Sequence, residues 1–397
     1  MSRSKVPLST PADLDAGASQ LLGLVRRHGT LTRAEMNAIT GWARVTVTSR
    51  LEQLLSTGLL APDEPTAGAR GRPASRYRVD PARAAFLVAD VGALGIRLAR
   101  CDLQSAVEET LDQCCLISDG PDAVLTLVRK GLDELAGDVD SRPVWGVGIS
   151  LPGPVEFEVG RVVRPPIMTG WDGVGLRDII TAWYDSPVLV DNDVNAMAVG
   201  EQTVSFPGKA DLLVVKVGTG VGAGIISDGH VLRGAAGAAG DIGHTWADPS
   251  GIRSDIPECR CGKRGCVEAY AGGWAIARDL SRELGRDMSV DDVVDLLRTG
   301  DSTTVRLVRD AGSILGASLA TAVSLLNPSA VVLGGQVAAA AGEHLLAGLR
   351  ERIYARALPL ATRDLPIRVS SLWPDAGVHG LARSIADAVL GTATSDR

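Results

Sequence analysis

A histidine and three cysteines in the second half of the chain have the types and the spacing of a metal site. They form the pattern H…C-x-C-x4-C, at His244, Cys259, Cys261 and Cys266. One imidazole and three thiolates complete a tetrahedral ligand set for Zn²⁺ and leave no position open for a reacting water. We therefore expect a structural Zn²⁺ that shapes a neighbouring site. The alternative is three buried free cysteines near an unrelated histidine, which this spacing disfavours.

Two motifs contain these ligands. The segment A-G-D-I-G-H ends at His244, and C-R-C-G-K-R-G-C-V-E ends at Glu268. Both resemble the signature of the ROK family, which is named for repressors, open reading frames and kinases and in which the two segments frame a sugar pocket. The resemblance covers nearly the whole chain. It implies that the zinc loop positions groups for binding a sugar.

The resemblance also supplies the sugar-binding candidates. Asn192-Asp193-Val194-Asn195 matches the family segment N-D-x-N, whose aspartate is the general base of the kinases. Asp241 replaces a family glutamate and is shorter by one methylene, and Ile167 stands where kinases place a sugar-binding asparagine, so the identity of the sugar stays open. The implied sugar-binding set is Asn192, Asp193, Asp241, His244 and Glu268.

The nucleotide side of the family pattern is only half present. Kinases of the family hold the ATP phosphates with an Asp-x-Gly-Gly-Thr hairpin, whereas this chain has Asp90-Val91-Gly92-Ala93-Leu94. Ala93 and Leu94 offer no side-chain donor and crowd the place of the phosphate oxygens. The second hairpin, residues 218–222, matches the family, although a Gly-rich hairpin can also be a plain tight turn. We therefore expect no enzyme activity, with Asp193 as a vestigial base.

The N-terminal part has the pattern of a winged helix-turn-helix. A helix is expected from Ala18 to His28, and Thr32 to Glu35 forms a capping box that opens a second helix. A third helix has an apolar stripe at Val47, Leu51 and Leu54, and an R-G-R-P loop and a short strand follow it. The alternatives are a helical hairpin used for oligomerisation or a plain linker whose arginines serve solubility. The expected DNA contacts are Arg44, Val45, Thr46, Ser49, Arg50, Arg70, Arg72 and Arg76.

Charge is distributed unevenly along the chain. Residues 1–83 contain 12 Lys+Arg and 7 Asp+Glu, whereas the rest contains 28 and 40. The basic end is where a polyanion would bind. Six cysteines without a secretory leader or an apolar run of membrane-spanning length lead us to expect a cytoplasmic protein with reduced thiols.

The body of the chain reads as a duplicated α/β unit. Apolar β segments at 86–91, 95–100 and 107–111 precede a helical segment, and 211–217 and 221–226 open a second unit in the same way, with V-A-D-V-G-A matched by V-V-K-V-G-T. We expect the two-lobed, actin-like and ribonuclease-H-like fold of sugar kinases. The predicted division is a flexible N-terminus at 1–17, a winged helix-turn-helix at 18–81, a first lobe at 82–195 completed by a C-terminal helix at 376–392, and a second lobe with the zinc loop at 196–375.

Together these patterns predict a DNA-binding transcriptional regulator, a repressor of carbohydrate-related genes whose kinase-like body senses a sugar without phosphorylating it. Its expected partners are an inverted-repeat DNA operator, a small sugar effector and further copies of itself in a homodimer or homotetramer, with no membrane. One alternative is an ATP-dependent sugar kinase with an extra N-terminal domain. Another is a DNA-binding repressor that responds to no ligand and retains a vestigial sugar fold.

Overall fold

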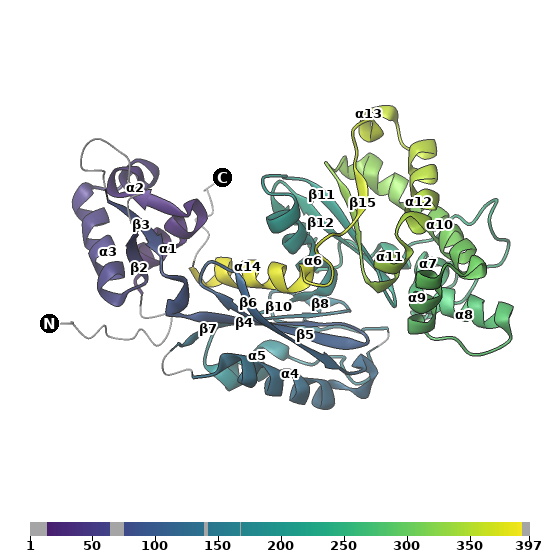
Figure 1. Cartoon of the computed structure of the whole chain (residues 1–397), viewed down its shortest axis with the longest axis horizontal. Helices are drawn as coiled ribbons and strands as arrows, with labels where there is room; N and C mark the ends of the chain where they lie inside the picture. The colour runs from purple at the N-terminus through teal and green to yellow at the C-terminus, as the bar shows by residue number, and fades with distance from the viewer. Residues whose placement is uncertain (1–13, 64–74, 139–141, 167, 391–397) are drawn as a thin grey trace.

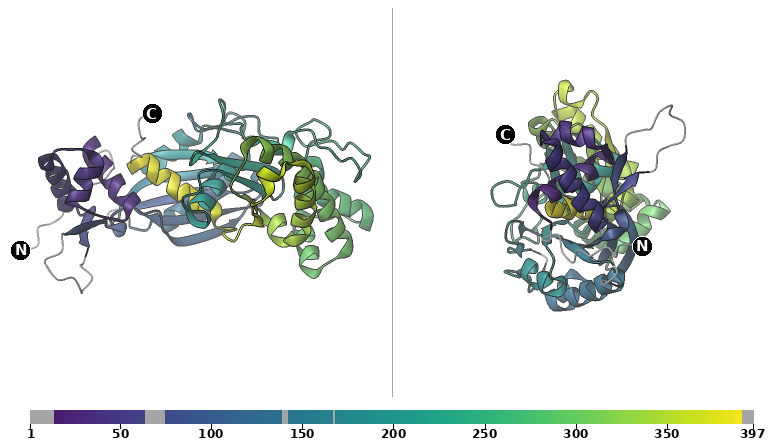
Figure 2. Two further views of the ribbon diagram at one scale, coloured as in Figure 1. Left: turned by 90° about the horizontal axis from the view of Figure 1, so that it is seen from above. Right: turned by 90° about the vertical axis from the view of Figure 1, so that its left-hand side faces the viewer.

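The computed structural model describes residues 14–63, 75–138, 142–166 and 168–390. A small unit of helices with a three-stranded sheet lies at one end of the long axis, and two larger α/β parts follow it (Figures 1 and 2). The fold class is α/β, as the sequence predicts. No helix in the described part of the chain is long and apolar enough to cross a membrane.

The N-terminal unit contains three helices, α1 (Ala16–His28), α2 (Arg33–Thr40) and α3 (Arg44–Thr57). Its sheet has the order β1-β3-β2, built from β1 (Thr30–Thr32), β2 (Leu60–Asp63) and β3 (Arg76–Val79). The predicted capping box is confirmed: the Thr32 hydroxyl accepts from the Glu35 amide at 3.2 Å, and the Glu35 carboxylate accepts from the Thr32 amide at 2.7 Å.

The first helix starts earlier than the sequence pattern suggests. The Asp15 carboxylate accepts from the amides of Gly17 and Ala18 at 2.9 and 3.0 Å and so caps α1 at Ala16. The prediction of a flexible segment through residue 17 is therefore corrected for its last residues, because Leu14 is buried and the helix is already formed at residues 16–17. Residues 1–13 lie outside the described residues.

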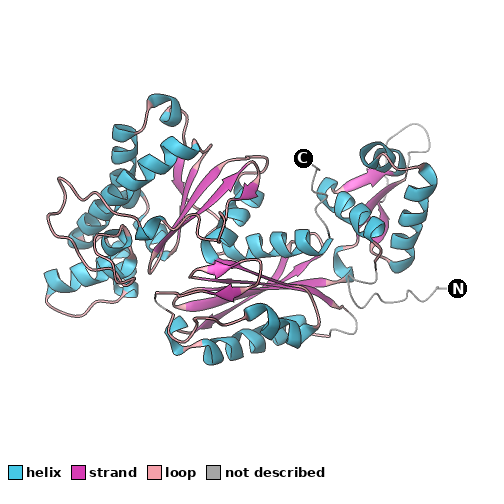
Figure 3. Cartoon of the chain, turned by 180° about the vertical axis from the view of Figure 1, so that it is seen from behind, coloured by secondary structure: helices cyan, strands magenta, loops and turns pink. Residues whose placement is uncertain are grey.

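The first large sheet has the order β10-β7-β4-β5-β6. Its strands are β4 (Ala85–Val91), β5 (Gly95–Asp102), β6 (Val107–Cys114), β7 (Val144–Leu151) and β10 (Val188–Asn192). Figure 3 shows helices on both faces: α4 (Pro121–Ala136) and α5 (Leu176–Tyr184) on one, and α14 (Ala376–Leu390) on the other. The short strands β8 (Val155–Glu156) and β9 (Arg161–Val162) form a separate hairpin.

The second large sheet repeats this plan with the order β13-β12-β11-β14-β15. Its strands are β11 (Leu212–Val217), β12 (Val221–Ser227), β13 (His230–Val231), β14 (Val331–Gly334) and β15 (Ile367–Val369). In both sheets the first three strands form an antiparallel meander. A fourth strand then pairs in parallel with the first strand of the meander, and a fifth pairs in parallel with the fourth. The duplication predicted from the two similar sequence segments is confirmed.

Among the residues that the structure describes, seven helices lie on the side of the second sheet that faces away from the first sheet (Figure 1). They are α7 (Glu268–Ala271), α8 (Gly273–Leu284), α9 (Val290–Thr299), α10 (Ser302–Leu326), α11 (Gln336–Ala341), α12 (Glu343–Arg356) and α13 (Pro359–Thr362). The long helices α10 and α12 contact closely because α10 has glycines at the crossing: a Cβ at Gly316 would lie 2.6 Å from the Leu349 carbonyl oxygen. This packing gives the second sheet its own apolar core.

Two helices link the sheets to each other. Helix α6 (Asp193–Gly200) follows β10 of the first sheet but packs against β11 and β12 of the second. Helix α14 follows β15 of the second sheet but packs against β4 and β7 of the first. The two helices also touch each other, since a Cβ at Gly380 would overlap the carbonyl oxygen of Ala196. A change in the angle between the sheets must therefore move α6 and α14 against each other.

The N-terminal unit is joined to the body through α14. The Arg26 guanidinium on α1 forms an ion pair with Asp387 on α14, and it donates to the Ser105 hydroxyl at 3.2 Å. Only 5% of the Arg26 side chain is exposed. One apolar cluster runs without a break from the N-terminal unit through Phe86 and Val88 to the buried face of α14. The unit is therefore docked on the body and does not hang from a free linker.

Candidate functional site

A cavity of about 570 Å³ lies between the two large sheets. Its lining comes from the ends of β4, β7 and β10, from the β11–β12 turn, and from the segment before His244. The structure brings all five sequence-predicted sugar residues to this one cavity: Asn192, Asp193, Asp241, His244 and Glu268. These residues come from both halves of the body, so the cavity is formed jointly by the two halves.

The Asn192 side chain forms hydrogen bonds within the protein. Its side-chain oxygen accepts from the Val194 amide at 3.0 Å and caps α6, and its side-chain nitrogen donates to the Gly153 carbonyl at 3.0 Å. These bonds fix the turn after β7 against the start of α6. Asn192 therefore shapes the cavity wall, whatever contact it makes with a ligand.

Asp193 is paired with a residue that was not among the predicted site residues. The Lys216 ammonium lies 2.6 Å from the Asp193 carboxylate, and both side chains are largely buried. Burial lowers the pKa of Lys216, but the nearby carboxylates Asp193 and Asp90 outweigh burial and raise it above its usual value. Lys216 is therefore charged at neutral pH and neutralises Asp193.

Glu268 ties the zinc segment to the second glycine hairpin. Its carboxylate accepts from the Val221 amide at 3.0 Å and from the Trp274 indole at 3.2 Å. A Cβ at Gly220 would lie 2.5 Å from this carboxylate, which explains why glycine is needed there. Asp241, in contrast, is exposed in the cavity and has no hydrogen-bond partner for its carboxylate among the described residues.

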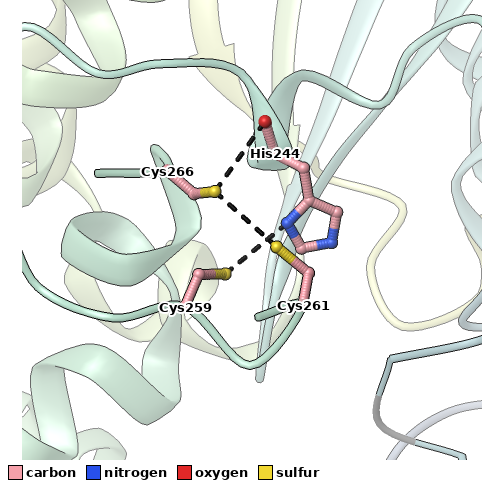
Figure 4. A group of neighbouring side chains, drawn as sticks. All are labelled: His244, Cys259, Cys261 and Cys266. Carbon is pink, nitrogen blue, oxygen red and sulfur yellow. Dashed lines mark hydrogen bonds between the residues drawn. The ribbon is translucent and has the colours of Figure 1, made fainter. Parts of the chain in front are cut away.

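The four predicted metal ligands meet in one cluster (Figure 4). Their ligand atoms all lie within 4.8 Å of one another, with the Cys259 sulfur 3.6 Å from His244 Nδ1 and the Cys261 sulfur 3.7 Å from the Cys266 sulfur. A tetrahedral ion with bonds of about 2.3 Å to sulfur requires ligand separations of roughly 3.8 Å. The cluster therefore fits a four-coordinate Zn²⁺.

The cluster is formed by a tight loop. The Cys259 amide donates to the Lys263 carbonyl at 2.7 Å, and Gly262 and Gly265 adopt φ angles of 85° and 71°, which glycine tolerates best. His244 directs Nδ1 toward the cysteines, and Figure 4 shows its other ring nitrogen pointing away from them. Because His244 also lines the cavity, one imidazole can serve the metal and the ligand site together.

The first glycine hairpin differs from a phosphate cradle. Ala93 and Leu94 both line the cavity where the resemblance places a glycine and a threonine. The Gly92 amide donates to the Gly95 carbonyl at 2.8 Å, and so it is already used within the turn. Ala93 and Leu94 therefore present apolar side chains where the resemblance places a phosphate-binding hairpin.

Helix α3 presents a short exposed face. Arg44, Val45 and Ser49 are exposed, and Val45 is 79% exposed although it is apolar. Thr46 is half-buried on the same side. Ala43 precedes the helix without a side-chain cap. This face is free for a partner at the N-terminus of the helix.

The other predicted DNA contacts divide into three cases. Arg50 forms an ion pair with Asp15, the residue that caps α1, and it thus joins two helices of the unit. Arg76 donates to the Thr30 hydroxyl and carbonyl, each at 3.0 Å. Arg70 and Arg72 lie outside the described residues. Sequence reasoning did not foresee the internal bonds of Arg50 and Arg76.

Two charged residues at or near the cavity were missed by sequence reasoning: Lys216 lines the cavity, and Arg233 lies outside its lining. One is Lys216, whose only signal was a charge inside an otherwise apolar strand. The other is Arg233, whose guanidinium lies 2.6 Å from the buried Asp191 carboxylate and 3.8 Å from the centre of the Phe157 ring. Arg233 thereby fastens the segment before Asp241 to β10 and to the β8–β9 hairpin.

Known proteins similar to this chain fall into two groups. The xylose repressor of Bacillus subtilis is 26% identical over 94% of this chain and 96% of its own length. A glucokinase of Halalkalibacterium halodurans is 31% identical over 93% of its own length, but it covers only 74% of this chain. A crystal structure of a ROK family transcriptional regulator, described as a homolog of the Escherichia coli Mlc protein, has a TM-score of 0.77, 25% identity, and coverage of 94% of this chain and 96% of that one.

The full-length relatives are thus regulators, and the glucokinase lacks a counterpart of about a quarter of the chain. The ROK family model matches residues 90–387, which begins at Asp90 of the first hairpin and leaves the N-terminal unit in front of it. The two sheets with α6 and α14 between them are therefore the actin-like body of this family. The chain belongs to the ROK family.

Proposed function

We propose that the protein is a transcriptional repressor of carbohydrate-related genes, and that a sugar bound between the two sheets controls its affinity for DNA. One observation carries this proposal. The N-terminal unit docks through Arg26 on α14, and the first turn of α14 lies against Asp90 in the cavity, where a Cβ at Gly377 would overlap the Asp90 carboxylate. One helix, α14, thus runs from the cavity to the unit that would bind DNA.

The proposed roles belong to three parts of the chain: the N-terminal unit up to residue 81, a first lobe at 82–195 completed by the C-terminal helix at 376–392, and a second lobe at 196–375. The cavity residues Asp193, Asp241 and Glu268 would bind the sugar hydroxyls. The exposed start of α3 would enter the major groove, where Val45 can contact a thymine methyl and Thr46 and Ser49 can reach base edges. A two-fold dimer would read an inverted repeat with half-sites one or more helical turns apart.

Structural Zn²⁺ is part of the proposal. The ion would be held by His244, Cys259, Cys261 and Cys266. Its role would be structural, because it would fix the loop that carries Glu268. Elemental analysis of purified protein should give about one zinc per chain. Cys261→Ser should release the loop and weaken sugar binding by at least about tenfold, because the loss of one ligand destabilises the whole site. Cys115→Ser, at a half-buried cysteine outside both the cluster and the cavity lining, is the control and should bind sugar as wild type does. Full sugar affinity in the metal-free protein would exclude this role.

The DNA-binding face can be tested with a charge reversal on α3. Val45→Glu with Ser49→Glu should lower the affinity for a selected operator by more than about a hundredfold, since two carboxylates would face the DNA phosphates. Both positions are exposed, and acidic groups are favourable in the first turns of a helix, so the melting temperature should stay within a few degrees. Leu358→Glu with Leu360→Glu, at two exposed apolar positions of the second half, adds the same two negative charges away from α3 and is the control for altered net charge. Fluorescence anisotropy with an operator selected from random duplexes measures the effect.

A second candidate function has its own support. The intact 218–222 hairpin, the retained Asp193 and the similarity to a glucokinase favour an ATP-dependent sugar kinase with an added N-terminal unit. Against it stand Ala93 and Leu94 in the first hairpin and the pairing of Asp193 with Lys216. A coupled assay of ADP release with a panel of hexoses and pentoses separates the two functions. We expect no sugar-dependent turnover, and clear turnover would favour the kinase.

A further inference from the structure

Lys216 occupies a position that the repeat relates to Asp90. Each is the second-to-last residue of the first strand of its meander, and each stands two residues before the glycine of a hairpin, in V-A-D-V-G and V-V-K-V-G. In the register, Asp90 is opposite Ser150 of β7, and Lys216 is opposite Gly334 of β14. The duplication thus places an acid and a base at matching ends of the two sheets, and both line the same cavity.

The carboxylates around Lys216 need a positive charge. Asp193 is 7% exposed and lies 2.6 Å from the Lys216 ammonium. Asp90 accepts from the Ser150 hydroxyl at 2.6 Å, and burial raises its pKa, an effect that the charge of Lys216 opposes. The ring centre of Trp373 lies 5.7 Å from the ammonium on a further side. Lys216 thus pairs directly with Asp193 and lies beside the ring of Trp373. Asp90 lines the same cavity and acts on Lys216 through its charge.

Two carboxylates that share a cleft between two glycine hairpins form an oxygen set suited to a hard divalent cation. An ammonium attached to the chain supplies the positive charge that such a cation would otherwise bring. We propose that Lys216 is a built-in counter-ion that fills the cation position between Asp193 and Asp90, so that the cavity takes an uncharged polyhydroxyl ligand and rejects a divalent cation or its nucleotide complex. The ligand class rests on the proposed function, whereas the counter-ion role does not.

The geometry explains why the cavity would accept a sugar and exclude a metal–nucleotide complex. A sugar hydroxyl can donate to a carboxylate and accept from the ammonium, and so it meets a pair whose charges already cancel. A metal–nucleotide complex would bring a divalent cation close to the fixed ammonium in a poorly solvated cavity, where like charges repel strongly. Lys216 is therefore a specificity-determining residue, and its removal should change which ions enter.

The test uses Mn²⁺ alone as the probe on the full-length, zinc-loaded protein. Lys216→Met removes the charge and keeps most of the side-chain volume, and Lys209→Met, at an exposed lysine, is the matched control. Electron paramagnetic resonance of free Mn²⁺ measures binding. We expect Lys216→Met to bind Mn²⁺ at least about tenfold more tightly than wild type or Lys209→Met. Adding Asp193→Asn to Lys216→Met should remove this gain. Equal Mn²⁺ affinity of wild type and Lys216→Met would overturn the proposal.

A second variant keeps the test decisive if Lys216→Met is unstable. Lys216→Gln keeps a hydrogen-bond donor for Asp193 without the charge, and it should also gain Mn²⁺ binding, whereas Lys216→Arg should exclude Mn²⁺ as wild type does. Mn²⁺ binding by Lys216→Arg equal to that of Lys216→Gln would contradict the charge argument. Neither measurement involves DNA or sugar. Failure here therefore leaves the repressor proposal standing, and failure of operator binding leaves the counter-ion role standing.

Discussion

Asp193→Asn is expected to abolish the response of operator binding to sugar while leaving operator affinity within about twofold of wild type. Asp193 lies in the cavity at the start of α6, and the exposed face of α3 is in the separate N-terminal unit. A buried carboxylate that binds hydroxyl groups contributes about 1.5–3 kcal/mol per charged hydrogen bond, so its loss should lower sugar affinity by at least about tenfold. Asparagine keeps the size of the side chain and limits the damage to packing.

Two controls accompany this variant. Asp287→Ala removes an exposed carboxylate between α8 and α9 and should respond to sugar as wild type does. Differential scanning calorimetry checks that Asp193→Asn is folded, because Lys216 loses its nearest partner in this variant. A folded Asp193→Asn protein with an undiminished sugar response would show that the effector does not use Asp193.

Arg26→Met is expected to uncouple the two ends of the molecule. The variant removes the charge that pairs with Asp387 and keeps the aliphatic stem, and Asp387 retains its 2.6 Å ion pair with Arg383. Breaking one partner of a buried pair costs about 3–5 kcal/mol, part of which the second arginine should offset. Sugar and operator should each still bind. The change in operator affinity caused by sugar should fall from about tenfold to less than about twofold.

Arg27→Met is the matched control for this experiment. Arg27 is the next residue on α1 and is exposed, so the substitution changes the net charge of the N-terminal unit equally and leaves the ion pair between Arg26 and Asp387 in place. Operator affinity is measured for both variants with and without saturating sugar. If Arg26→Met keeps the full response of wild type, the signal does not pass through the contact between α1 and α14.

Local signals in the sequence predicted the elements well. The Thr32–Glu35 capping box and the apolar positions Val47, Leu51 and Leu54 depend on neighbours within one or two helical turns, and these features appear as expected. The duplication was visible because two meanders with similar residues open the two halves. The metal cluster could be predicted because its four ligands lie within 23 positions of one another in a glycine-containing loop.

Long-range pairs could not be predicted in the same way. Lys216 and Asp193 are 23 positions apart, and they meet only because α6 crosses from the first sheet to the second. Arg26 and Asp387 are separated by 361 positions, so their contact depends on the whole fold. Arg50 was expected on the DNA face, but the capping residue Asp15 lies within its reach. Such pairings follow from packing angles, which the hydrophobic pattern does not contain.

Sugar in the cavity and DNA on α3 are expected to affect each other's binding. Isothermal titration of each sugar into the free protein and into the operator-bound protein tests this expectation directly, because coupling between two sites is reciprocal. A sugar that weakens operator binding tenfold must bind about tenfold more weakly to the operator complex, a difference of about 1.4 kcal/mol. We predict this difference for the sugar that binds best. Identical sugar affinities in the two states would contradict the account, since no free energy would then connect the cavity to the operator.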